Sequence, residues 1–316
     1  MATRIYVGDF QPGSTITGCF ALKWKQLDQF RGKPGQYLSL GLFDGRQDVR
    51  AVMWDGGPEV FPHLDTDVVW LEGSLNSFRG NLQIVINRIR PAQRGEYDPR
   101  DFLPTAPIDI EAVFASLLEV VAGIENPHLR ALLEHFFHDP NWARDFREAP
   151  AAKGIHHAYL GGLLEHTWHV VQICQQACQL YPALDRDLLI TGAILHDIGK
   201  IEEYTYRVTI DHSDAGRLLG HIVLGDERVC QAMETVEDFP PGLALRLRHL
   251  LISHHGEYEW GSPKRPKTAE ACVLHHADNM DAKAHQFLAL QETDEQGWTP
   301  YNKSLGRMIF LGRDDR

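Results

Sequence analysis

Long apolar runs are missing from this sequence. No stretch approaches the ~18 consecutive apolar residues that a membrane-spanning helix needs, and MATRIYVGDFQPGS at the start lacks the apolar core and cleavage site of a secretory leader. The five cysteines are odd in number and scattered over 316 residues, which excludes a disulfide framework as the basis of the fold. We therefore expect a folded cytoplasmic protein that does not associate with membranes.

Positive charge is also scarce. The formal net charge of -12 excludes a protein that wraps nucleic acid over its whole surface. The first 100 residues carry 12 Lys and Arg against 11 Asp and Glu, whereas the rest of the chain carries 19 against 32. Histidine is uneven too, because 13 of 17 lie between positions 156 and 285. The chemistry is therefore expected in the second part of the chain.

The first part has the signals of β-strands. Leu38, Leu40 and Leu42 alternate with other residues over 37–43, and Asp44-Gly45 predicts a turn into the next strand. Further strands are predicted over 48–54, 67–75 and 82–90, with a helical turn over 58–64. Short strands of this kind favour a small N-terminal β-barrel such as an OB-fold.

A proline-rich stretch separates this barrel from a helical part. Four prolines lie between Pro91 and Pro107, which is typical of a linker. Apolar stripes with helical spacing begin after residue 108, and helices are predicted near 157–180, 186–198, 214–233, 241–254 and 267–290. We thus predict a multidomain protein: an OB-fold over 1–92, a linker over 93–107 and an all-α domain over 108–316.

His196 and Asp197 end an apolar helical run in ITGAILHDIGK. At a helix end, the imidazole can bind one metal ion while the carboxylate bridges two. The partners that such a centre requires are available in other helical segments: His166, His221, His254, His255 and Asp278. One buried histidine is more often a hydrogen-bonded core residue, but seven residues in this pattern indicate a metal centre within a helical bundle.

The order H, HD, H, HH, D resembles the HD superfamily of metal-dependent phosphohydrolases over about residues 150–290. The strings HHAYLGGLLEHT, HDIGK, SHHGEYEWGSPK and HHADNMDAK resemble more specifically the YhaM-type 3'-to-5' exoribonucleases, in which an OB-fold precedes the HD domain. The resemblance implies hydrolysis of single-stranded RNA to nucleoside 5'-monophosphates, with single-stranded DNA as an alternative substrate.

The resemblance also implies two divalent ions. One would be held by His166, His196, Asp197 and Asp278, and the other by Asp197, His221, His254 and His255. Such a donor set favours Mn²⁺ over Mg²⁺, with Fe²⁺, Co²⁺ and Ni²⁺ as alternatives. The related HD-GYP enzymes add a third ion through a glutamate at the position of Gly162, so the sequence favours two.

Other residues are expected to act around the metals. Asp197 is the expected catalytic bridge, Lys200 a donor to a phosphate oxygen, and Asp281 an acceptor that orients a ligand histidine. Basic and aromatic residues are expected to bind single-stranded nucleic acid: Trp24, Lys25, Arg50, Trp54, Phe78 and Arg79 in the barrel, and Lys264 and Arg265 in a loop. Core packing of the aromatics and a solvated loop are the alternatives.

Three functions remain open on the sequence alone. The first is the exoribonuclease. The second is an HD phosphodiesterase that acts on a nucleotide or a cyclic dinucleotide, with the barrel as a regulatory module. The third is a non-catalytic nucleic-acid-binding factor. A homo-oligomer is compatible with each of them.

Overall fold

A computed structural model describes residues 6–30, 32–78, 81–93, 95–154, 157–206, 208–290, 293 and 296–312, except for the side chains of residues 99 and 100. The chain divides into two compact units: residues 1–104 with 206–210, and residues 105–205 with 211–316. Within the described ranges, no helix combines the length and the apolar character needed to span a membrane.

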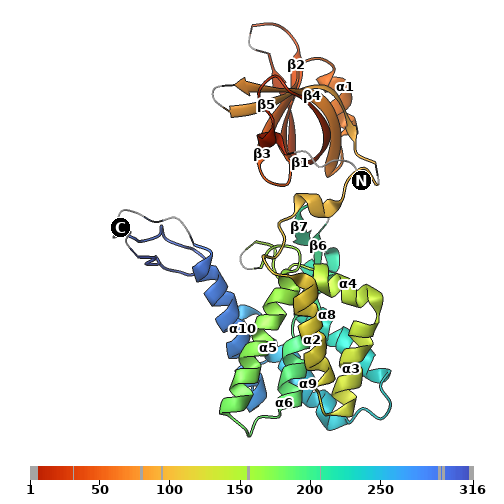
Figure 1. The fold of residues 1–316 in the computed structure, drawn as a ribbon, viewed down its shortest axis with the longest axis vertical. Helices are drawn as coiled ribbons and strands as arrows, with labels where there is room; N and C mark the ends of the chain where they lie inside the picture. Colours follow the sequence, from red (N-terminus) through yellow and green to blue (C-terminus); the bar gives the residue numbers. More distant parts are fainter. Residues whose placement is uncertain are drawn as a thin grey trace. The chain divides into compact units, whose positions relative to one another are not determined.

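The first unit is a closed barrel of five strands in the order β1-β2-β3-β5-β4 (Figure 1). The strands are β1 Thr15–Gln29, β2 Gln36–Phe43, β3 Asp48–Met53, β4 Val68–Phe78 and β5 Asn81–Pro91. Neighbouring strands are antiparallel except β3 and β5, which are parallel. Short turns of helix stand at η1 Val7–Asp9, α1 Gly57–Val60, η2 Phe61–His63 and η3 Pro99–Phe102. The predicted N-terminal barrel is confirmed.

The barrel interior is filled by the residues whose alternation predicted the strands. Leu38, Leu40 and Leu42 are fully buried, because successive β2 side chains point to opposite faces and these three point inward. Gly73 lies at a shift in the β4–β5 register, where an added Cβ would stand 2.4 Å from the carbonyl oxygen of Val85. Glycine therefore permits the close strand approach that closes the barrel.

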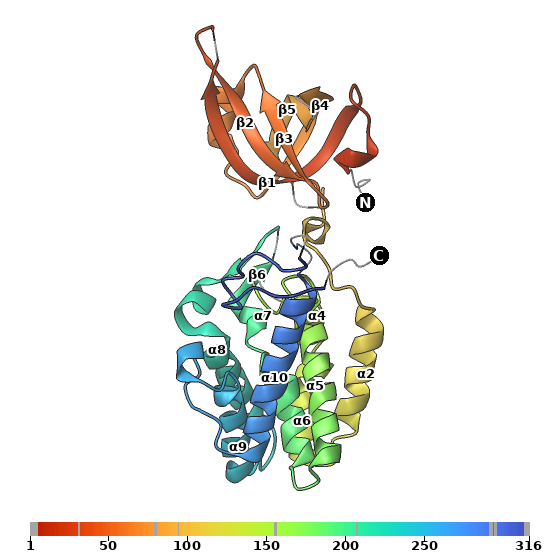
Figure 2. The same cartoon turned by 90° about the vertical axis from the view of Figure 1, so that its left-hand side faces the viewer.

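The second unit is built mainly from helices. They are α2 Ile110–Ala122, α3 Pro127–His138, α4 Pro140–Glu148, α5 Gly162–Leu180, α6 Arg186–Leu195, α7 Lys200–Glu203, α8 Asp214–Glu234, α9 Pro241–Ser253, α10 Ala269–Leu288 and the 3-10 turn η4 Tyr258–Trp260. Side chains cap several helix starts; Asp185 accepts from the backbone of Leu188, and Thr268 from that of Ala271. Figure 2 shows α5, α6 and α10 side by side, in agreement with their mutual contacts.

One element departs from the predicted all-α character. Strands β6 Tyr204–Tyr206 and β7 Ile210–His212 form a short two-stranded sheet between α7 and α8. Three residues per strand are too few to produce a readable alternation, so the pattern gave no signal. The helical prediction for the segments around this sheet is confirmed.

Candidate metal centre and nucleic-acid interface

Helix α6 carries the His-Asp pair to the centre of the helical unit. Every residue from Leu188 to Lys200 is buried, so α6 runs through the interior instead of over the surface. The helix ends at Leu195, and His196 is its C-terminal cap. At Gly199 an added Cβ would stand 2.1 Å from the carbonyl oxygen of His221. Glycine after His-Asp therefore lets the α8 backbone approach the pair closely.

The two carboxylate oxygens of Asp197 face two sets of imidazoles. Oδ2 lies 3.3 Å from Nε2 of His166 and 3.3 Å from Nε2 of His196. Oδ1 lies 3.5 Å from Nε2 of His221 and 3.7 Å from Nε2 of His254. Asp278 adds a second carboxylate on the first side, with its Oδ1 3.2 Å from Nε2 of His166. Asp197 thus stands between two groups of nitrogen donors.

In three of the histidines, Nδ1 lies within hydrogen-bond distance of a backbone carbonyl oxygen. Nδ1 of His196 lies 2.9 Å from the carbonyl oxygen of Ala193, and Nδ1 of His254 lies 2.7 Å from that of Leu251. Nδ1 of His255 lies 2.9 Å from the carbonyl oxygen of Trp260. A carbonyl oxygen only accepts, so each Nδ1 carries the proton and each Nε2 presents a lone pair.

Asp281 orients His166 from the opposite side. Its Oδ2 accepts from Nδ1 of His166 at 2.7 Å, and its Oδ1 accepts from Nδ1 of His169 at 2.8 Å. Nε2 of His157 lies 3.0 Å from the same Oδ2. Burial disfavours the charged carboxylate, but the three imidazoles outweigh it and lower the pKa of Asp281. A carboxylate that stays ionised is a strong acceptor for the proton of His166.

Glu203 has the corresponding role for His221, although the sequence pattern did not predict it. One oxygen of Glu203 lies 3.0 Å from Nδ1 of His221, and the other accepts from the backbone N–H of His221 at 3.2 Å. This pairing depends on Gly220, whose φ of 74° interrupts helix α8 just before His221. A glycine inside an otherwise helical pattern is the one signal that could have indicated the kink.

His254 and His255 can face the same group of donors because helix α9 ends directly before them. The helix stops at Ser253, and Gly256 has a φ of 80°. On an ideal helix two successive residues diverge by about 100°, but here the ring centroids of His254 and His255 are 4.5 Å apart. The two histidines and His221 each offer a nitrogen within 4.8 Å of the others, so the end of the helix brings both histidines into one group of donors.

The electrostatics of the centre suit cation binding. Burial opposes ionisation of Asp197, but Lys200 and His196 outweigh it and hold the pKa of that carboxyl well below its usual range. Burial, together with the neighbouring histidines, holds the pKa of His254 well below its usual range. An ionised carboxylate and a neutral imidazole are the protonation states that bind metal ions.

The donor atoms also fit a metal because some of them have no other partner. Among the described residues, Oδ1 of Asp197 and Nε2 of His221 and His254 are buried without a hydrogen bond. Leaving a buried polar atom unsatisfied costs about 1–3 kcal/mol, and these three atoms converge on one point. A second group, formed by His166, His196 and Asp197, also offers atoms within 4.8 Å of one another.

Lys200 and Gly162 lie beside the centre. Nζ of Lys200 is buried and 2.7 Å from Oδ2 of Asp197. At Gly162, an added Cβ would stand 2.1 Å from the carbonyl oxygen of His157. This close backbone approach leaves no room for the glutamate that supplies a third ion's ligand in the HD-GYP pattern.

Comparison with known proteins identifies the family. The model of the HD domain family matches residues 163–283, which include all seven metal-ligand candidates. The chain is 36% identical over 254 residues to the 3'-5' exoribonuclease YhaM of Bacillus velezensis, covering 80% of this chain and 79% of the relative. It is 35% identical over 287 residues to the protein of the same name from a Geobacillus species, covering 88% and 87%. This chain belongs to the YhaM family.

In this YhaM-family chain, the outer face of the barrel carries a group of aromatic side chains. There the ring of Trp24 lies over Gly41, since a Cβ at Gly41 would stand 2.0 Å from the indole nitrogen. Trp54 is 41% exposed, and its ring centroid lies 4.7 Å from that of Tyr37. Phe30 completes this group, with its ring 5.2 Å from Tyr37. An aromatic surface of this kind can stack nucleobases.

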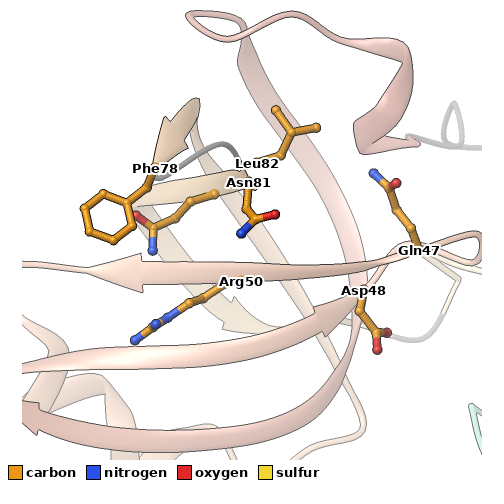
Figure 3. Close-up of a pocket in the computed structure, with 7 residues that line it drawn as sticks. Gln47, Asp48, Arg50, Phe78, Asn81 and Leu82 are labelled. Atoms are coloured by element: carbon orange, nitrogen blue, oxygen red, sulfur yellow. The ribbon is translucent and has the colours of Figure 1, made fainter.

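A pocket of about 550 Å³ adjoins this surface and is lined by Gln47, Asp48, Arg50, Phe78, Asn81, Leu82 and Gln83. Figure 3 shows Arg50 and Phe78 directed toward one end of the pocket, with Gln47 and Asp48 at the other. Phe78 is 55% exposed, and a guanidinium nitrogen of Arg50 lies 3.2 Å from the hydroxyl of Ser39. Residues of three strands are thus brought to one concave site.

The other described residues that were predicted to contact nucleic acid lie outside the aromatic surface and the pocket. Nζ of Lys25 donates to the carbonyl oxygen of Phe61 at 3.3 Å, away from the aromatic surface, and Arg79 lies outside the described residues. Lys264 is in the loop after the histidine pair, and Arg265 there pairs with Glu257 at 2.8 Å. Phe30 and Tyr37 were missed, although the inward alternation of Leu38 and its neighbours points Tyr37 outward.

Proposed function

We propose that this chain is a 3'-5' exoribonuclease that uses two divalent ions to hydrolyse single-stranded RNA to nucleoside 5'-monophosphates. The observation that carries the proposal is the position of Asp197, whose two oxygens each face a separate pair of histidine Nε2 atoms. The similarity to exoribonucleases over about four fifths of the chain supports RNA as the substrate.

The residues divide into two sets of metal ligands. His166, His196 and Asp278 would hold one ion and His221, His254 and His255 the other, with Asp197 shared. Five imidazoles with two carboxylates favour Mn²⁺ over Mg²⁺. Two ions bound there would make a water nucleophilic at neutral pH and stabilise the charge of an in-line displacement at phosphorus.

The protein's own groups prepare the site for this reaction. Asp281 and Glu203 fix the orientation of His166 and His221, so the ligands need no rearrangement. Lys200, 2.7 Å from Asp197, helps to keep that carboxylate ionised and is proposed to donate to a phosphate oxygen. Lys264 and Arg265 supply positive charge for the strand in an otherwise acidic unit.

The barrel is proposed to bind the strand upstream of the cleaved bond. Trp24, Trp54 and Phe78 offer stacking surfaces that accept any base, and Arg50 a phosphate contact. The division into an OB-fold over 1–92, a linker over 93–107 and an HD domain over 108–316 is part of this proposal.

The test is digestion of a 5'-labelled single-stranded RNA by metal-depleted protein to which Mn²⁺, Mg²⁺, Fe²⁺, Co²⁺ or Ni²⁺ is returned. We expect a ladder of single-nucleotide steps with Mn²⁺, release of nucleoside 5'-monophosphates, and loss of both in Asp197→Ala. Intact RNA together with hydrolysis of a cyclic dinucleotide would favour the small-substrate alternative. Binding of RNA without metal or hydrolysis would favour the non-catalytic one.

A further inference from the structure

The loop that follows the histidine pair carries two exposed aromatic side chains. Tyr258 and Trp260 belong to the turn η4 and are 56% and 53% exposed. Large aromatics contribute most to stability when they are buried, and neither the metal ligation nor the reaction described above uses these two rings.

Trp260 is connected to both neighbouring metal-ligand candidates. Its carbonyl oxygen accepts from Nδ1 of His255 at 2.9 Å. Its ring lies 5.9 Å from the ring of His275, and Nδ1 of His275 donates to the carbonyl oxygen of His254 at 2.8 Å. The exposed indole therefore stands on the same framework that fixes the two ligands.

The loop around Trp260 is held in one conformation. Ser262 is buried, and its hydroxyl lies 3.3 Å from the carbonyl oxygen of Ile252 and 2.7 Å from that of Lys264. The backbone N–H of Trp260 donates to the carbonyl oxygen of Glu257 at 3.1 Å. An aromatic ring that is already fixed loses little entropy when a ligand stacks on it.

Positive charge lies on the same loop. The guanidinium of Arg265 stands 5.1 Å from the ring centroid of Tyr258, and Lys264 and Lys267 flank it in the sequence. Because Arg265 pairs with Glu257 at 2.8 Å, the exposed Lys264 and Lys267 supply the charge for a phosphate. A flat apolar surface with cations beside it complements a nucleotide, whose base is planar and whose phosphate is anionic.

We propose that Trp260, assisted by Tyr258, stacks on the base of the 3'-terminal nucleotide and so positions the last phosphodiester at the metal centre. The inference rests on the exoribonuclease function proposed above. An exonuclease meets every base in turn at its active site, and stacking is the interaction that accepts all four because each has a π-face. Trp260 is thus assigned as a substrate-positioning residue.

The test compares Trp260→Ala with the full-length parent protein in Mn²⁺ on three substrates. These are an RNA, the same RNA with an abasic 3'-terminal nucleotide, and bis(4-nitrophenyl) phosphate, a phosphodiester without a base. We expect kcat/KM on the RNA to fall roughly tenfold to a hundredfold, with little change on the other two. Trp260→Phe should recover most of the activity, since it retains a planar ring.

The side-chain change leaves the carbonyl of residue 260 that His255 uses, and unchanged metal content verifies this. Tyr181→Ala is the control, because Tyr181 is also an exposed aromatic residue but lies beyond the far end of α5 from His166. An unchanged rate on RNA, or an equal loss on all three substrates, would overturn the inference. A parent protein that hydrolyses bis(4-nitrophenyl) phosphate but never shortens RNA would instead reject the proposed function.

Discussion

The metal centre and the aromatic face of the barrel are built on opposite principles. In the centre, the ligand candidates are buried or partly buried, and each of the five histidines is oriented by another group, as Asp281 orients His166. On the barrel face, Trp24, Trp54 and Phe78 are 47%, 41% and 55% exposed. One region is a cooperative network, whereas Trp24 and Trp54 in the other have no described contact in common.

The difference predicts how each region responds to substitution. Groups that share a hydrogen-bond or metal network are strongly non-additive, because losing one leaves its partners unsatisfied. Exposed stacking contacts without shared partners add nearly independently. A single mutation in the centre should therefore remove most of the activity. Mutations on the barrel face should each weaken RNA binding by a separate amount.

The largest effect is expected from His254→Ala. It removes a proposed ligand whose Nε2 has no hydrogen-bond partner among the described residues, and loss of a catalytic metal interaction worth several kcal/mol lowers kcat by at least about 10³. RNA digestion and metal analysis measure the two losses. His276→Ala is the control, since His276 is exposed on α10. A His254→Ala variant with parental metal content and rate would contradict the assigned ligand set.

The Asp281→Asn substitution should have an intermediate effect. An amide is a weaker acceptor for the protons of His166 and His169, and loss of such an orienting group costs about 10- to 100-fold in metal affinity or activity. Titration with Mn²⁺ followed by activity measures the affinity. Asp214→Asn, on the exposed first turn of α8, is the control. Equal Mn²⁺ affinities in all three proteins would show that Asp281 has no orienting role.

The sequence predicted the parts of this comparison that depend on local pattern. The alternation of Leu38, Leu40 and Leu42 predicted the barrel core. The apolar run before His196 predicted the helix that ends at the His196-Asp197 pair. Glu203 escaped prediction because its pairing with His221 depends on the kink at Gly220, which brings together residues 18 positions apart. Phe30 and Tyr37 meet Trp54 only after β1, β2 and β3 pair. Tertiary contacts of this kind leave no periodic signal.

On the barrel face, Trp24→Ala and Trp54→Ala should each weaken RNA binding about 5- to 20-fold, within the range for one stacked base. The double variant should show the product of the two effects, since the rings share no described contact. Equilibrium binding in Ca²⁺, with hydrolysis of bis(4-nitrophenyl) phosphate as the activity control, measures this. A double variant no weaker than either single one would mean that the two rings act as one unit, contrary to the comparison.

The smallest effect is expected from Lys264→Ala. A single exposed lysine that contacts a phosphate contributes mainly by releasing a counterion, so its loss should weaken RNA binding about two- to threefold at low salt. It should also reduce the slope of log K against log salt concentration by about 0.7 for a single strand. Lys303→Ala removes an exposed charge of the C-terminal tail instead and should leave the slope unchanged. If both variants change the slope equally, the effect follows net charge and Lys264 makes no phosphate contact. If only Lys264→Ala changes the slope, the loop beside the metal centre contacts part of the RNA strand.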